Sequence, residues 1–134
     1  MSVSAHRDGL ASALSTLFSG RVFDTVPDGV VTPCAIVVPT GITYDEAFAN
    51  GLHTYNYSIL VVVGRSDERT AQDRLDGYCD PTGSGSVRAA LKADPTLSSA
   101  VFDLRVTEMR NYRSLEVDQV TYLSAEFIVA VIAA

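Results

Sequence analysis

Residues His53 to Gly64 read HTYNYSILVVVG, and this stretch predicts the central strand of a small sheet. Its first half alternates, which places the histidine and both tyrosines on one face of a strand and polar residues on the other. Its second half, Ile59–Val63, is an unbroken apolar run, typical of a strand covered on both faces. The β-branched and aromatic residues favour a strand over a helix. We expect Gly64 to end the strand and a charged helix to follow.

The composition is that of a globular protein, and we expect a single domain over residues 1–134. Of the 134 residues, 47% are hydrophobic and 19% are charged, a balance that supports a buried core and argues against disorder. The net charge of −6 argues against a protein that reads nucleic-acid sequence, because such proteins usually carry a basic patch. The sequence shows no signal peptide and no apolar run near the ~20 residues of a membrane span. We expect a soluble protein with Cys34 and Cys79 as reduced thiols.

The first part of the chain predicts one helix and two short strands. Residues 3–19 place leucines on one stripe of a helix, with His6 on its polar side. Residues 21–26 and 34–38 predict short strands, and a proline at each end limits the second. Residues 40–52 have no clean period, so we expect a loop or a projecting hairpin there.

The second part predicts two helices and then a long antiparallel hairpin. The helices are expected at residues 65–79 and 87–93, and Ser86 is the expected cap of the second. Residues 100–112 and 119–132 alternate and should pair, with a polar turn at residues 113–118 between them. The order of elements predicts an α+β domain with a mainly antiparallel sheet of long strands and helices packed on one face.

The predicted strands are long for a body of this size. A globule of this length has a radius of gyration of roughly 14 Å and so a diameter near ~36 Å. A strand rises about 3.3 Å per residue, so residues 53–64 span nearly ~40 Å and residues 119–132 more. The strand ends must bend or stand out, and projecting ends leave sheet edges and apolar surface in water. Such ends suit a ring or stack in which a neighbour covers them.

No set of residues predicts catalysis, a metal site or a cofactor site, so we do not expect an enzyme. His6 and His53 each fit a solvated position, and neither is spaced with a cysteine as metal ligands require. The stretch from Gly83 to Ser86 precedes a helix, as a phosphate-binding loop does, but it lacks the P-loop lysine and a preceding strand. A plain linker fits it better, and a small phosphate-binding α+β domain is the less favoured alternative.

The last predicted turn carries a cluster of arginines with an aromatic residue. Arg110 and Arg113 flank Tyr112, with Arg105 nearby, and these are the residue types of a patch that binds nucleic acid. Acidic residues lie among them, including Glu116, and cross-strand charge pairing therefore explains the cluster better.

Four pieces of the sequence together resemble the tail terminator proteins of long-tailed siphophages that infect actinobacteria. They are PCAIVVP at residues 33–39, VGRSDERTAQDRLD at 63–76, SVRAALKADPTL at 86–97 and RNYRSLEVDQVTYLSAEF at 110–127. The resemblance extends over nearly the whole chain, from about residue 10 to residue 131. These pieces are patterns of a structural family and not catalytic signatures.

The resemblance implies a subunit of a hexameric ring that caps the growing tail tube, ends its polymerisation and meets the head-side connector. The implied partners are other copies of the chain, the major tail-tube protein and the connector or neck protein, and no membrane is involved. Genomic DNA would pass through the pore without sequence-specific binding, and an acidic lining would let it slide. The implied location is the tail–neck junction of the virion, after assembly in the host cytoplasm. A head-closure or other neck adaptor of the same virion is the alternative, because the sequence barely separates the two.

We expect residues that contact partners in two places. Tyr44, Phe48 and Leu52 lie in the predicted projecting loop, and Arg110, Tyr112 and Arg113 lie at the last predicted turn. For each of these six residues, ordinary packing within the subunit is an equally good explanation.

Overall fold

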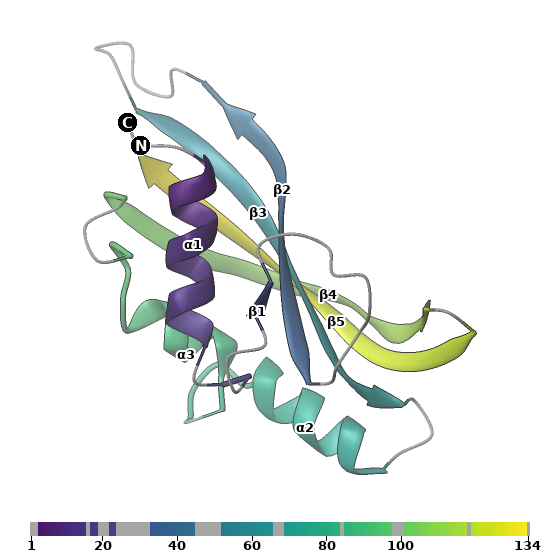
Figure 1. The fold of residues 1–134 in the computed structure, drawn as a ribbon. Coiled ribbons are helices and arrows are strands. Elements are labelled where there is room, and N and C mark those ends of the chain that lie inside the picture. Colours follow the sequence, from purple (N-terminus) through teal and green to yellow (C-terminus); the bar gives the residue numbers. More distant parts are fainter. Residues whose placement is uncertain are drawn as a thin grey trace.

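Five strands form one twisted sheet in the order β1-β2-β3-β5-β4 (Figure 1). This arrangement is seen in a computed structural model that describes residues 3–15, 17–18, 22–23, 33–44, 52–65, 69–83, 85–97, 101–117 and 119–133. The strands are β1 (Val22–Phe23), β2 (Cys34–Thr43), β3 (His53–Arg65), β4 (Asp103–Val117) and β5 (Val120–Ala133). β1 pairs with β2 in parallel, and the other three pairs are antiparallel. The predicted α+β class with a mainly antiparallel sheet is therefore confirmed.

Three helices pack on one face of this sheet (Figure 1). They are α1 (Val3–Leu14), α2 (Arg69–Cys79) and α3 (Val87–Lys92). Their buried side chains meet alternate residues of β3 and β5 in one hydrophobic core, which includes Leu10, Leu14, Leu75, Leu91, Tyr57, Ile59, Val61, Phe127, Val129 and Val131. None of the helices that the structure describes has the length and hydropathy needed to cross a membrane.

The predicted central strand is β3, which lies between β2 and β5 and pairs with both. Its apolar run is buried on the helix side, and Val62 on the opposite side is also fully buried, whereas Leu60 is half-buried. The predicted end at Gly64 is wrong, since the strand continues to Arg65. The register against β5 shifts between Val62 and Gly64, and this bulge carries the strand past the glycine.

β2 is longer than predicted because a proline lies within it. The strand runs from Cys34 to Thr43 instead of ending before Pro39. Its register against β3 shifts between Pro39 and Gly41, so the proline lies at a bulge. In the described part of the chain, β1 pairs only with the first part of β2, which leaves the other side of Pro39 without a strand. A residue that lacks an N–H is tolerated at such an edge position.

β4 also passes through residues that were predicted as a turn. It runs from Asp103 to Val117, and its register against β5 shifts between Arg110 and Arg113. Asn111 at this bulge has a φ of 56°. Pairing then continues until Val117 meets Val120, so β4 extends through residues 113–117. The predicted polar turn at residues 113–118 is therefore wrong for residues 113–117, and residue 118 lies outside the described residues.

The first helix differs from its prediction in length and in one buried side chain. α1 ends at Leu14, before the predicted residue 19, and a turn follows in which Leu17 N donates to Leu14 O at 3.1 Å. His6 was predicted on the polar side but is fully buried. It lies four residues before Leu10 and eight before Leu14, and positions with this spacing share one face of a helix. That face points to the tyrosines of β3.

Candidate assembly surface

The face of the sheet opposite the three helices carries a mixture of apolar and polar side chains. No helix of the described residues packs on it. Cross-strand rows on this face are Val38–Ser58–Ile128–Glu108 and Ile36–Leu60–Glu126–Arg110. Val38 is 39% exposed and Ile132 is 42% exposed, whereas Val62 and Ile36 on the same face are buried.

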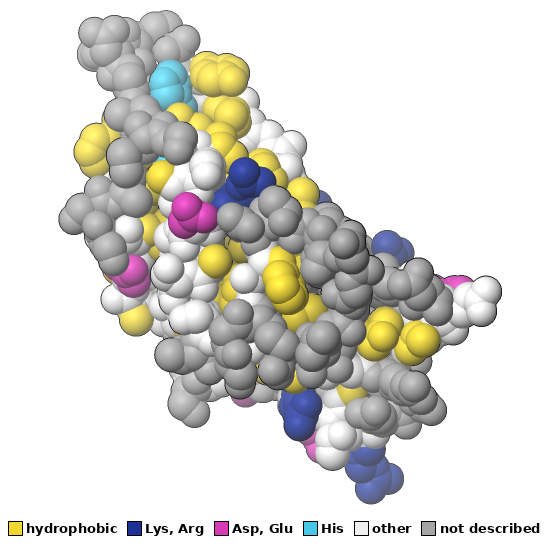
Figure 2. Space-filling model, in the orientation of Figure 1, with side chains coloured by type: hydrophobic (Ala, Val, Ile, Leu, Met, Phe, Trp, Pro, Cys, Tyr) yellow, Lys and Arg dark blue, Asp and Glu magenta, His cyan; other side chains and the backbone are white. Residues whose placement is uncertain are grey.

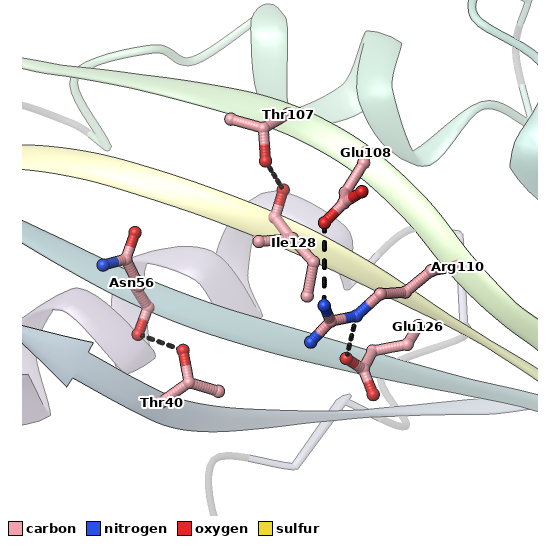
Figure 3. A network of polar contacts seen from close by, with 7 residues as sticks. All are labelled: Thr40, Asn56, Thr107, Glu108, Arg110, Glu126 and Ile128. Carbon is pink, nitrogen blue, oxygen red and sulfur yellow. Dashed lines mark hydrogen bonds and ion pairs between the residues drawn. The ribbon is translucent and has the colours of Figure 1, made fainter.

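Polar contacts on this face join neighbouring strands (Figure 3). Thr40 Oγ1 donates to the carbonyl of Asn56 at 3.1 Å, which joins β2 to β3. Thr107, at a bulge of β4, donates through Oγ1 to the carbonyl of Ile128 on β5 at 3.2 Å. The side chain of Thr107 thereby adds a bond to the strand pair where its ladder is interrupted. These bonds join neighbouring strands on a sheet face where no helix of the described residues packs.

Arg110 is held by carboxylates of its own sheet. Its Nε lies 3.0 Å from Oε1 of Glu126 on β5, and its Nη1 lies 3.7 Å from Oε1 of Glu108 on β4 (Figure 3). The Arg110 side chain is 53% exposed, so each pair contributes less than about 1 kcal/mol. Cross-strand charge pairing is therefore confirmed for Arg110, with Glu126 as the partner.

The other two residues of the predicted β4 cluster differ in what they contact. Tyr112 Oη donates to Asp76 Oδ1 on α2 at 2.8 Å, which fastens β4 to that helix. Burial and then this hydrogen bond raise the pKa of Tyr112 to about 12, so its hydroxyl stays protonated. The carbonyl of Arg113 accepts from Ser124 Oγ at 3.2 Å, while its side chain is exposed. Within the described residues, Arg113 has no ion-pair partner and is the cation of this cluster that is open to another molecule.

The residues predicted at the projecting loop lie at the other end of the sheet. Tyr44 is 66% exposed, and its ring meets the ring of His53 edge to face at 5.5 Å. Leu52 is half-buried, and Phe48 lies outside the described residues. The strand register shows how far apart the two predicted groups lie. Ile132 of β5 is level with Thr54 at the loop end of the sheet, and Ser124 of β5 pairs with Arg113. Ile132 and Ser124 are eight positions apart on β5, a distance of about 26 Å. The structure therefore does not bring the two predicted groups together.

Phe102 and Ile132 belong to the same end of the sheet and were not predicted as contact residues. Phe102 is 63% exposed, and its N–H donates to the carbonyl of Ile132 at 2.9 Å. Phe102 directly precedes the first residue of β4 and is exposed, whereas Leu104 within the strand is buried. The exposed apolar side chains at this end of the sheet are Tyr44, Phe102 and Ile132. The sequence alone could not show that these three residues lie at the same end, because that depends on the strand register.

In the view of Figure 2, the described Lys, Arg, Asp and Glu side chains lie at separate places on the surface. The described residues contain no group of three or more His, Cys, Asp or Glu side chains that could hold a metal ion. Burial, with the nearby charges of Asp76 and Asp80, raises the pKa of Cys79 to about 11, so its thiol stays protonated. Cys79 is therefore not an activated thiol.

The loop before α3 uses its serine for the structure of the helix. Ser86 Oγ accepts from the N–H of Ala89 at 3.1 Å, which confirms the predicted cap, and it donates to the carbonyl of Asp80. Both capacities of this hydroxyl are therefore engaged inside the chain, and Ser84 lies outside the described residues. The geometry favours the linker interpretation over a phosphate-binding loop.

Within the described residues, the surface thus offers a strand edge at β4 that pairs with β5 alone and exposed apolar residues at one end of the sheet. These features suit contacts with other proteins more than the binding of a small substrate. No protein-family model matches this sequence, and a search of curated proteins finds no match.

Proposed function

We propose that this protein is a structural subunit of a siphophage tail. In this proposal it forms a ring that caps the tail tube, ends tube polymerisation and provides the joint to the head-side connector. Genomic DNA passes through the pore of the ring without sequence-specific binding. The resemblance of residues 10–131 to tail terminator proteins suggests this role, and physical features of the fold support it.

The observation that supports the proposal most is the outer strand β4. It has fifteen residues and lies at the edge of the sheet, where it pairs with β5 only, as far as the described residues show. A long open edge is a template for pairing with another chain, and proteins that stay monomeric usually keep such edges short or covered. β4 carries two bulges, but these leave most of its length extended. In an assembly, a neighbouring chain that lies against this edge pairs with its free backbone N–H and C=O groups.

The side chains that catalysis would use already have structural tasks. His6 is buried and bonded to Tyr57, Ser86 caps α3 and Cys79 stays protonated. Three hollows lined by described residues lie beside β4, and none of these three encloses converging acid and base groups. These facts support a structural protein over an enzyme or a phosphate-binding domain.

Light scattering of the purified protein, alone and mixed with the tail-tube protein of the same genome, tests the proposal. We expect a ring, formed either alone or on the tube as template, because the tube end presents a repeating surface on which subunits meet. A strict monomer that ignores the tube protein would contradict it.

Deletion of the gene separates this role from that of a head-closure or neck adaptor. Loss of a terminator should produce overlong tails or polytubes, because nothing then ends tube growth. Loss of a head-side adaptor should leave tails of normal length that are not attached to heads. Thermal-shift screening with nucleotides tests the phosphate-binding alternative. That alternative predicts that a nucleotide clearly raises the melting temperature and that Arg88→Ala abolishes this increase.

A further inference from the structure

A groove with three cationic side chains lies between α3 and the outer strand β4. Its volume is about 250 Å³, and it is lined by Arg88, Lys92, Leu104, Arg105 and Val106. Arg88 Nη1 donates to the carbonyl of Pro81 at 3.1 Å. Lys92 and Arg105 are exposed, and neither has an ion-pair partner among the residues that the structure describes. The groove is thus lined by three cationic residues, although the net charge of the chain is −6.

The groove follows the open edge of β4. Leu104 is buried and Val106 is half-buried, so apolar side chains lie between the cations. A second hollow of about 200 Å³ shares Arg88 and Val106 and extends the groove along the strand. Glu108 lines this second hollow, and its carboxylate is paired with a neighbouring arginine. An extended acidic segment with interleaved apolar residues fits such a groove, because its carboxylates meet the cations while its backbone lies along the strand edge.

The hairpin end that joins β4 to β5 has this chemistry. Residues 115–120 read LEVDQV, with two acidic residues, no basic residue and apolar residues between them. Glu116 is exposed, and in the described part of the chain it has no ion-pair partner. Sequence and charge therefore make this end complementary to the groove.

A single chain cannot place its own hairpin end in its own groove. Arg105 and Glu116 are eleven positions apart on one extended strand, a separation of about 36 Å. Figure 1 shows α3 and the hairpin end at opposite ends of β4. The complementary surfaces can therefore meet only between two molecules.

We propose that the groove between α3 and β4 binds the hairpin end of a second copy of this chain, with Glu116 facing Lys92 and Arg105. This inference rests on the proposed function and names the subunit contact of the ring. The two surfaces are different, so the contact repeats head to tail from one copy to the next, and such contacts close into a ring when the rotation per copy allows it.

Charge reversal tests the contact in the full-length chain, with the tail-tube protein as template and sedimentation velocity as the measure of assembly. Lys92→Glu and Glu116→Lys should each weaken assembly about tenfold or more, because each places like charges in contact. The double variant Lys92→Glu/Glu116→Lys restores an opposite pair and should assemble within about threefold of the wild type. Arg74→Glu, at an exposed position of α2, changes the net charge as Lys92→Glu does and should assemble normally. Thermal melts of all variants establish that they are folded.

The outcomes separate this inference from the proposed function. If both single variants assemble as well as the wild type, the inferred contact is overturned, whereas the proposed ring is not. Weakening by Lys92→Glu without any effect of Glu116→Lys also overturns it, since another acidic segment then occupies the groove. Absence of assembly by the wild type itself, with or without the tube protein, overturns the proposed function and the inference together.

Discussion

The buried contact between α1 and the central strand gives the sharpest stability prediction. His6 Nδ1 lies 2.8 Å from Tyr57 Oη, and both side chains are almost fully buried, at 0% and 1% exposure. The His6 ring also meets Tyr55 edge to face at 4.6 Å. Tyr57→Phe keeps the ring but removes the hydroxyl, so a buried imidazole nitrogen loses its partner. We expect the free energy of unfolding to fall by about 1–3 kcal/mol.

The expected change in melting temperature follows from the length of the chain. An unfolding entropy of about 2.1 cal/mol/K per residue over 134 residues gives about 0.28 kcal/mol/K, so a loss of about 2 kcal/mol lowers the Tm by about 7 °C. Tyr44→Phe is the matched control, because Tyr44 is 66% exposed, and its Tm should not change.

A double-mutant cycle tests the pairing itself. His6→Leu alone leaves the Tyr57 hydroxyl buried without its partner, whereas the double variant His6→Leu/Tyr57→Phe replaces both partners with apolar groups. We expect the double variant to be more stable than the sum of the single losses by about 1–2 kcal/mol. Additive losses, or a Tm for Tyr57→Phe equal to that of the wild type, would refute the reasoning.

Four further predictions concern the helices and the pH dependence. In α2, Gly77→Ala should raise the free energy of unfolding in urea by about 0.5–1 kcal/mol, because nothing lies within 4 Å of an added Cβ. Gly9→Ala should instead lower it by about 1 kcal/mol, because the new methyl would lie 3.0 Å from Leu97 Cβ; a gain equal to that of Gly77→Ala contradicts this. Ser86→Ala should cost about 1 kcal/mol through loss of the cap, and an unchanged urea midpoint contradicts that role. Burial, and then the N-terminal charge, lower the pKa of His6 from its usual 6.5, so protonation favours the unfolded chain. Stability should therefore fall as the pH drops below that value, and by less in His6→Leu; identical pH profiles for the two proteins would count against the burial.

Local sequence was sufficient to predict the central strand and the cap of α3. The alternation and then the apolar run of β3 reflect its own burial, and Ser86 precedes its helix directly. The bulges were not predictable in the same way, because a bulge depends on the register of the partner strand. Gly64 and Pro39 usually end a strand, and only the pairing of β3 and β2 shows that the chain continues past them.

Contacts between distant segments limited the prediction of the candidate surface. His6 lies 51 residues from Tyr57, and the hydrogen bond that allows its burial is not written in the sequence around it. The spacing of His6 with Leu10 was the available signal, but the polar side chain argued against the buried face. The charge partner of Arg110 was expected among nearby acidic residues, and the cross-strand register supplies Glu126. The cationic groove likewise exists only because α3 packs against the start of β4.

Native mass spectrometry of the wild-type protein with its tail-tube protein tests the central claim most directly. The account predicts a ring of six copies of the 14.3 kDa chain, about 86 kDa, found free or bound to the tube. A single copy of the chain in every sample, with and without tube protein, would contradict it.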